Sequence, residues 1–167
     1  MSDYGDSRLQ ELLGRLAKNL ERDELVQATT DYLKDFLNVD RIVLYYFYYE
    51  WKGRVTFESL SSLQFSIFGS TGADDCFNDE YAKLYQAGRV KAIPDIKLEP
   101  LHPCHREFLE SIGVRANLVV PILNSKRLWG LLIAHHCGDA HFWLPSEIKA
   151  MKQAAVKLAK AASIHDS

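Results

Sequence analysis

Apolar residues recur at every third or fourth position in three stretches of this chain, a spacing that is typical of amphipathic helices. The stretches are residues 1–22, 23–38 and 145–164. The apolar faces consist of Leu9, Leu12, Leu13, Leu16 and Leu20 in the first stretch, Leu25, Tyr32, Leu33, Phe36 and Leu37 in the second, and Ile148, Met151, Ala155, Leu158 and Ala162 in the third. The pattern predicts two helices at the start of the sequence and one at its end.

Between these helices the sequence changes to β-branched and aromatic residues, which favour strands. Residues 40–60 are expected to form a hairpin around a turn at Lys52 and Gly53. Residues 116–123 and 127–136 predict a second pair of strands. In the last of these strands the alternation of side chains places Trp129, Leu131, Ile133 and His135 on one face.

Two shorter helices, over residues 79–88 and 103–113, are expected between the two pairs of strands. They adjoin the connections 66–79 and 89–103, and connections longer than a dozen residues are uncommon unless they serve a function. The order of elements predicts an α+β fold: an antiparallel sheet with the terminal helices on one face and the shorter helices and long loops on the other. A ligand would lie between the sheet and these loops.

The composition is that of an ordinary globular domain. The 167 residues fit one domain, and contents of 47% hydrophobic and 25% charged residues are usual. The net charge is −2, and no basic stripe argues for binding to nucleic acid or to an anionic membrane. The sequence contains no apolar signal core and no run of membrane-spanning length, so the cytoplasm is the expected location.

A cysteine stands at the start of the helix expected over 103–113, in the sequence PCHREFLESIG. Unpaired N–H groups and the helix dipole favour the thiolate at this position, and the thiolate is the nucleophilic form of cysteine. Cys104 shares a helical face with Phe108 and Ile112, and His105 lies beside it. The thiol and the imidazole are both expected to point toward the sheet, which suits Cys104 to covalent chemistry.

Three kinds of site fit these residues. A cysteine–histidine hydrolase would need His105 as the base for the thiol, but adjacent helical residues diverge by about 100°. A zinc site would draw on Cys76, Cys104, His105, His135 and Cys137, which lack the paired spacing of zinc ligands. A covalently attached prosthetic group needs one thiolate and an enclosed aromatic cavity, without any apparatus for turnover. The spacing disfavours the first two readings and leaves the third open.

The chain resembles the bilin-binding GAF domain of the cyanobacteriochromes, photoreceptors related to phytochromes, from about Leu9 to its last helix. Three motifs carry the resemblance: CHREFLESIGVRANLVVPIL at 104–123, LWGLLIAHH at 128–136, and DDCF at 74–77. The third looks like the Asp-Xaa-Cys-Phe element of the two-cysteine subfamily. The resemblance implies one GAF photosensory domain over residues 1–167, with a six-stranded antiparallel sheet and with helices and loops that enclose the chromophore.

The resemblance assigns covalent roles to two cysteines. Cys104 matches the cysteine that forms a thioether to ring A of a linear tetrapyrrole, here phycocyanobilin or phycoviolobilin. Cys76 matches a second cysteine that adds reversibly to the bridge between rings B and C and moves absorption to the violet or blue. Light isomerises the double bond next to ring D, the second thiol leaves, and absorption moves to longer wavelength.

Further contacts to the chromophore follow from the same resemblance. His105 matches the histidine that packs against the central pyrroles, and His135 matches the histidine that faces ring D. Asp74 matches the motif's aspartate, which would stabilise a protonated chromophore. Asp75 departs from the family pattern, because relatives often have proline there. The remaining expected contacts are Phe77, Tyr81 and Tyr85, and Arg89, whose guanidinium would bind a propionate.

The resemblance also implies a signalling protein rather than an enzyme, one that attaches its own bilin. The sequence contains no kinase, methyl-acceptor or cyclase segment, so a kinase or chemoreceptor output domain is expected in a parent protein. The terminal helices are expected to pack together, on the sheet, or on a second copy in a homodimer. The competing class is a GAF-type module that binds a cyclic nucleotide without a covalent bond, and two thiols at these positions argue against it.

Overall fold

The computed structural model describes residues 2–71 and 77–167 of the chain, with side chains from residue 7 onward. The helices are α1 (Ser2–Arg22), α2 (Glu24–Leu37), α3 (Asp79–Gln86), α4 (Pro103–Ser111), α5 (Pro145–Ala159) and α6 (Ala162–His165), with a 3-10 helix η1 at Leu63–Phe65. The strands are β1 (Arg41–Tyr49), β2 (Lys52–Leu60), β3 (Lys91–Ile93), β4 (Ala116–Leu123) and β5 (Leu128–His136). The helix expected over residues 1–22 corresponds to α1.

The described strands form one antiparallel sheet in the order β2-β1-β5-β4-β3. Five strands are present in the described part of the chain, so the expectation of six is wrong in that detail. Beside the edge strand β2, Gly69 and Ser70 each make one backbone hydrogen bond to Val55. Gly69 has a φ of 83°, a left-handed conformation that prevents this segment from continuing as a strand.

Two of the expected boundaries in the sheet region are also wrong. The β1–β2 hairpin turns at Glu50 and Trp51, and Gly53 already pairs with Phe47 inside the hairpin. A Cβ atom at Gly53 would lie 2.4 Å from the Tyr45 ring, so the glycine permits a close approach of the strands rather than a turn. Strand β3 lies in a stretch expected to be loop, because three residues are too few for an alternating pattern to be recognised.

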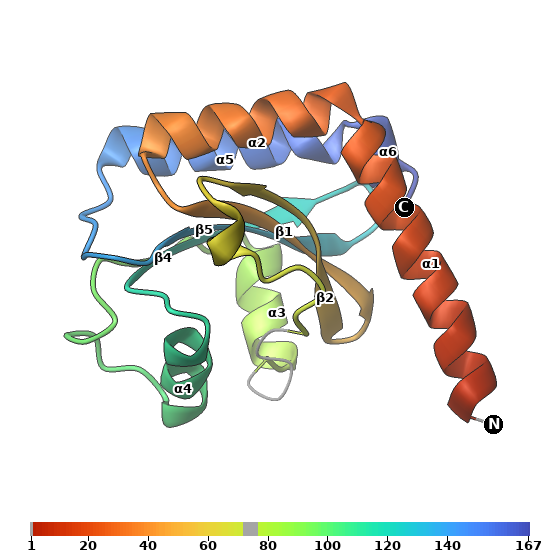
Figure 1. Cartoon of the computed structure of the whole chain (residues 1–167), viewed down its shortest axis with the longest axis horizontal. Helices are drawn as coiled ribbons and strands as arrows, with labels where there is room; N and C mark the ends of the chain where they lie inside the picture. The colour runs from red at the N-terminus through yellow and green to blue at the C-terminus, as the bar shows by residue number, and fades with distance from the viewer. Residues whose placement is uncertain (1, 72–76) are drawn as a thin grey trace.

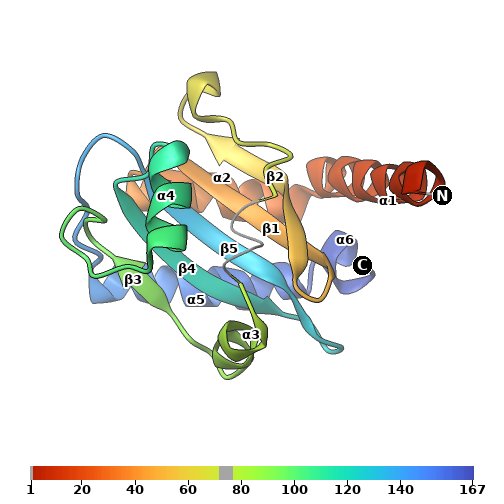
Figure 2. The ribbon, with the colours of Figure 1, turned by 90° about the horizontal axis from the view of Figure 1, so that it is seen from below.

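Figures 1 and 2 show the sheet between two layers of helices: α2 and α5 lie side by side on one face, and α3 and α4 lie on the other. Strand parity produces this division. In β1, Ile42 and Leu44 belong to the core under the terminal helices, whereas Val43 and Phe47 belong to the core on the α3 side. The predicted α+β fold, with the terminal helices on one face of an antiparallel sheet, is confirmed.

Helix α2 buries a different stripe from the one that its apolar pattern indicated. Leu33 is fully buried as expected, but Tyr32 and Phe36 are exposed and stack with their ring centroids 5.6 Å apart. Thr30 takes a place in the buried stripe instead. Its hydroxyl donates to the Val26 carbonyl at 2.8 Å, which satisfies the polar group inside the core.

The C-terminal helix is shorter than the predicted 145–164. Helix α5 ends at Ala159, and the chain turns at Ala161, whose backbone is extended, before α6 begins. The turn allows Ser163 to donate from its backbone N–H and its hydroxyl to Asp23 Oδ2, at 3.1 and 2.6 Å. Asp23 also caps the start of α2, so one carboxylate connects the N-terminus of α2 with α6.

Strand β5 departs from simple alternation near its start. Trp129 was expected on the same face as His135, yet it packs in the core under the terminal helices, with its ring centroid 5.1 Å from that of Tyr46. The β4–β5 pairing shifts register between Ile122 and Leu123. An irregularity of this kind inserts a residue into one strand and reverses which face later side chains take.

Candidate functional site

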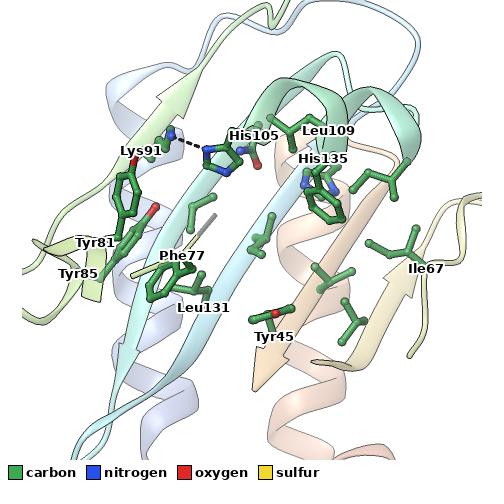
Figure 3. A pocket seen from close by; sticks show the side chains of 17 residues that line it. Tyr45, Ile67, Phe77, Tyr81, Tyr85, Lys91, His105, Leu109, Leu131 and His135 are labelled. Carbon is green, nitrogen blue, oxygen red and sulfur yellow. Dashed lines mark hydrogen bonds between the residues drawn. The ribbon is translucent and has the colours of Figure 1, made fainter. Parts of the chain in front are cut away.

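A cavity lies between the sheet and the helices α3 and α4, on the face where a ligand was expected (Figure 3). Its free volume is about 80 Å³, so a large ligand would require side chains of its wall to move outward. Most of the wall is apolar, as is usual for small-molecule sites. The side chains that matter for its chemistry are Tyr81, Tyr85, Lys91, His105, Asn117 and His135.

Helix α4 forms one wall of this cavity. His105 reaches the cavity together with Phe108, Leu109 and Ile112, the stripe that a helix presents to one side. His105 reaches the cavity as expected, whereas Cys104 is half-buried at the start of the helix and is not among the residues that line the cavity. A rotation of about 100° per residue separates the two side chains.

Two side chains hold the start of α4 in place: His102 caps the helix, and Arg106 binds the loop that precedes it. The ring of His102 accepts a hydrogen bond from the Cys104 backbone N–H, with 3.1 Å from Nδ1 to N. Arg106 donates to the backbone carbonyls of Ile96 and Glu99 in the preceding loop. The position of Cys104 at the edge of the cavity is therefore set by the loop as well as by the helix.

His105 Nδ1 lies 3.2 Å from the ammonium nitrogen of Lys91 on β3 (Figure 3). Because the ammonium donates, Nδ1 accepts and the ring proton lies on Nε2. Burial, followed by the nearby cations Lys91 and Arg89, lowers the pKa of His105 to about 4. Burial and Arg89 likewise lower the pKa of Lys91. His105 is therefore neutral at pH 7 and presents a donor to the cavity side.

The buried His105 predicts a loss of stability in mild acid. The unfolded chain takes up a proton below the ordinary histidine pKa of 6.5, whereas folded His105 stays neutral down to a pKa of about 4. Stability conferred by neutral His105 is therefore present above pH 6.5 and falls by about 2 kcal/mol toward pH 5. Urea unfolding of the bilin-free protein at pH 7 and pH 5 measures this loss. Between pH 7 and pH 5, the free energy of unfolding should fall less in His105→Gln than in the wild type. In the exposed variant His165→Gln it should fall by the same amount as in the wild type. An equal loss in all three proteins would refute the assignment.

Arg89 lies over two aromatic rings at the edge of the cavity. Its guanidinium carbon is 5.8 Å from the ring centroid of Tyr81 and 5.6 Å from that of Tyr85. Its Nη1 atom is buried and has no hydrogen-bond partner in the described part of the chain. A second, polar hollow of about 400 Å³ adjoins the cavity here and shares Tyr81, Lys91 and His105 with it. Arg89 and Lys91 thus place two cations at this border without a carboxylate in ion-pair contact among the described residues.

His135 lines the opposite end of the cavity and is 3% exposed. Arg41 Nε donates to His135 Nδ1 at 2.9 Å, and the two other guanidinium nitrogens donate to the carbonyls of Phe65 and Ile112 at 2.9 and 2.7 Å. Burial, together with this cation, holds the pKa of His135 well below its ordinary value. Arg41 therefore joins β5, η1 and the end of α4, and it keeps His135 neutral.

The expected aromatic contacts Phe77 and Tyr81 do meet at the cavity. The Phe77 ring lies 5.0 Å from Phe47, 6.1 Å from Tyr81 and 6.0 Å from Tyr85, measured between centroids. Tyr85 is almost fully buried, and burial raises its pKa to about 12. These rings form a continuous aromatic wall on the side of α3 (Figure 3).

Asp74 and Cys76 lie outside the described residues. Of the described residues on either side of their segment, Phe77 lines the cavity and Thr71 contacts a residue that does. The Tyr45 hydroxyl, which belongs to a cavity-lining residue, donates to the Thr71 carbonyl, and Phe77 is part of the cavity wall.

Three residues of this site were missed by the sequence interpretation. Lys91 stands in a stretch expected to be loop, Asn117 in an apolar strand, and Arg41 at the start of another. For Asn117 and Arg41 the sequence does carry a signal: a polar residue within a buried strand needs a partner or a ligand. Neither residue belongs to a motif with a known spacing, so its role depended on the fold.

No cluster of three or more histidine, cysteine, aspartate or glutamate side chains suited to a metal ion occurs among residues 2–71 and 77–167. Within the same residues, every helix is too short or too polar to cross a membrane.

An antiparallel sheet with terminal helices on one face, and a cavity under α4 on the other, defines an α+β domain with a candidate small-molecule site. A model of the GAF domain family matches residues 21–162, and the chain belongs to this family. It is 51% identical to an uncharacterized protein of Picosynechococcus over 92% of this chain and 94% of that protein. It is 35% identical to a putative methyl-accepting chemotaxis protein of Synechocystis, covering 90% of this chain but only 15% of that protein.

Solved structures of cyanobacteriochromes and phytochromes share the fold. The blue-light absorbing form of the Thermosynechococcus elongatus PixJ GAF domain has a TM-score of 0.72 and 32% identity, covering 80% of this chain and 82% of that one. A phycocyanobilin-bound GAF domain of a cyanobacterial phytochrome has a TM-score of 0.74 and 27% identity, covering 95% and 94% of the two chains. The recognition of a cyanobacteriochrome-type GAF domain from the sequence is thus confirmed, while the two-cysteine subfamily stays a prediction.

Proposed function

We propose that this chain is a photosensory module that binds a linear tetrapyrrole, phycocyanobilin or phycoviolobilin, through Cys104. The observation that carries the proposal is the position of Cys104, at the start of a helix whose next residue, His105, lines an apolar cavity. Likeness to bilin-bound GAF domains supports it. The test is expression in cells that make phycocyanobilin, followed by absorption spectra and a zinc-stained denaturing gel. A colourless, non-fluorescent protein would refute the proposal.

The residues of the cavity fit such a group. A bilin is a long conjugated molecule with two propionate carboxylates and two lactam ends. The aromatic wall around Phe77 suits its conjugated plane, and Arg89 Nη1, buried without a described partner, suits a carboxylate. The small free volume requires rearrangement of the wall on binding. When bound, the bilin would absorb light and isomerise at the double bond next to ring D.

Each of the remaining site residues then has a defined task. Cys104 supplies the sulfur of the permanent thioether, favoured as a thiolate by its place at the helix start. His105, neutral at pH 7 with its proton on Nε2, would hydrogen-bond the central pyrroles. Asp74 would accept hydrogen bonds from pyrrole N–H groups. His135 would hydrogen-bond ring D, the part of the molecule that rotates.

Cys76 is proposed as the colour switch. Its sulfur would add to the carbon that bridges rings B and C, shorten the conjugation, and give a violet- or blue-absorbing form. Its departure after isomerisation would restore absorption at longer wavelength. The position of Phe77, the next residue in the chain, in the cavity wall supports this role.

Arg89 and Lys91 are proposed to bind the propionates, since both cations lie at the polar hollow and lack a carboxylate in ion-pair contact within the described residues. Arg89→Gln and Lys91→Met should each slow attachment of phycocyanobilin at limiting concentration by roughly 10-fold, the effect of losing a hydrogen bond to a charged group. Phycocyanobilin dimethyl ester, which lacks the carboxylates, should attach to all three proteins at the same reduced rate. Lys83→Met, on the exposed side of α3, is the control. If a variant slows the attachment of phycocyanobilin and of its dimethyl ester by the same factor, the proposed contact with the propionates is wrong.

The module is proposed to signal rather than to catalyse, with turnover absent apart from its own bilin attachment. The chain spans 15% of the chemotaxis relative and 24% of a circadian histidine kinase of Synechocystis, which supports a chemoreceptor or kinase output domain in a parent protein of the cytoplasm. Contact with that partner, or with a second copy in a homodimer, is proposed through the terminal helices. The exposed apolar side chains Leu12, Tyr32 and Phe36 on α1 and α2 support this interface.

A further inference from the structure

Asn117 is a polar residue inside the cavity wall with no assigned task. It stands on β4, is 3% exposed, and lines the cavity. Its Oδ1 atom is buried without a hydrogen-bond partner among the described residues. An amide buried in this way costs stability, because it has left water and gained no hydrogen bond in return. A group that is retained at such a cost indicates a ligand that completes it.

His135 is the cross-strand neighbour of Asn117 in the β4–β5 ladder. Directly opposed residues of an antiparallel pair project to the same face with Cβ atoms about 5 Å apart. Because Arg41 donates to His135 Nδ1, the proton of the neutral ring is on Nε2. One end of the cavity therefore presents a fixed N–H donor beside a carboxamide that can both donate and accept.

We propose that Asn117 and His135 together bind the lactam at one end of the chromophore, and that Arg41 acts as the positioning residue that holds His135 in the donating tautomer. A lactam carries one N–H and one C=O on the same edge, which is the complement of a carboxamide beside an N–H donor. A ligand with an apolar end group would leave both the Asn117 carboxamide and the His135 ring N–H without a hydrogen-bond partner. The inference rests on the proposed binding of a bilin and adds the residue that recognises its end group.

The test compares Asn117→Leu with the parent protein in a Cys76→Ala/Cys104→Ala background, in which phycocyanobilin binds without a covalent bond. Asn117→Leu should weaken binding by roughly 10-fold, the effect of lost hydrogen bonds in a buried site. The same change should raise the Tm of the bilin-free protein by about 2–4 °C, because an unpaired buried amide is removed. Asn19→Leu, the same substitution at an exposed position of α1, should change neither quantity.

A spectroscopic measurement separates a hydrogen bond from a packing effect. In the covalently loaded protein, the N–H in-plane bending band in the resonance Raman spectrum, identified by its shift in D2O, should move to lower wavenumber on Asn117→Leu, because the lactam N–H that donates to Asn117 Oδ1 loses its acceptor. Nitrogen-15 NMR of the bilin-free protein should show His135 with its proton on Nε2, and Arg41→Lys should mix the two tautomers, because a single ammonium cannot replace three guanidinium donors.

The outcomes are distinct. Equal affinity and an unmoved N–H bending band in Asn117→Leu would overturn this inference and leave the proposed function intact. A wild-type His135 with its proton on Nδ1 would overturn the role of Arg41. Failure of the wild-type protein to bind phycocyanobilin at all would overturn both this inference and the proposed function.

Discussion

Cys104→Ala is expected to abolish covalent attachment of phycocyanobilin, so that the fluorescent band on a zinc-stained denaturing gel disappears. The physical reason is the position of Cys104 at the start of α4, where the helix dipole favours the thiolate that attacks the bilin. The cavity and the cations Arg89 and Lys91 remain in the variant. The native variant should therefore still acquire colour from added phycocyanobilin and lose it on denaturation.

Cys137→Ala is the matched control for this experiment. Cys137 follows β5, where its backbone N–H donates to Asp40 at 2.7 Å and burial raises the pKa of its thiol. A half-buried thiol with a raised pKa is a poor nucleophile, so this variant should attach bilin as the wild type does. If the fluorescent band persists in Cys104→Ala but is lost in Cys137→Ala, attachment occurs at Cys137 and our assignment of Cys104 is wrong.

Cys76→Ala is expected to have the second largest effect, on colour rather than on attachment. The variant should bind bilin covalently through Cys104 and yet lack the violet- or blue-absorbing form, because the sulfur that interrupts the conjugated system is gone. Absorption spectra before and after illumination measure this loss. Cys137→Ala again serves as the control and should keep both forms.

The alternative outcome for Cys76 is equally clear. If Cys76→Ala and the wild type show the same pair of spectra, the two-cysteine photocycle is wrong for this protein, while bilin binding through Cys104 stands. A blocked thiol gives an independent check: a thiol reagent added to the long-wavelength form should prevent return to the short-wavelength form in the wild type only.

Much of the fold was accessible from local pattern. The strands β4 and β5 were predicted within one residue of their observed ends, because a continuous apolar run of eight or nine residues on each side of a turn is a strong signal. The failures share a cause. Strand β3 is too short to carry a pattern, the buried side of α2 includes Thr30, and Trp129 changes face at a shift in register. Each depends on what the element packs against.

The candidate site divides in the same way. Cys104 and His105 stand out in the sequence because a thiol at a helix start has a chemical meaning wherever that helix lies. Lys91, Arg41 and Asn117 have none until the chain folds, since their partners are far away in the sequence: Arg41 and His135 are 94 residues apart.

The sequence by itself determined the α+β class, the terminal helices, and a resemblance that points to a bilin photoreceptor, because these depend on periodicity and on contiguous motifs. Only the tertiary structure decided that His105 is neutral, that Arg89 and Lys91 lie together at a polar hollow, and that Asn117 has an unpaired amide beside His135. Burial and long-range hydrogen bonds determine charge state, tautomer and unmet hydrogen-bonding capacity, and these exist only when distant segments are brought into contact.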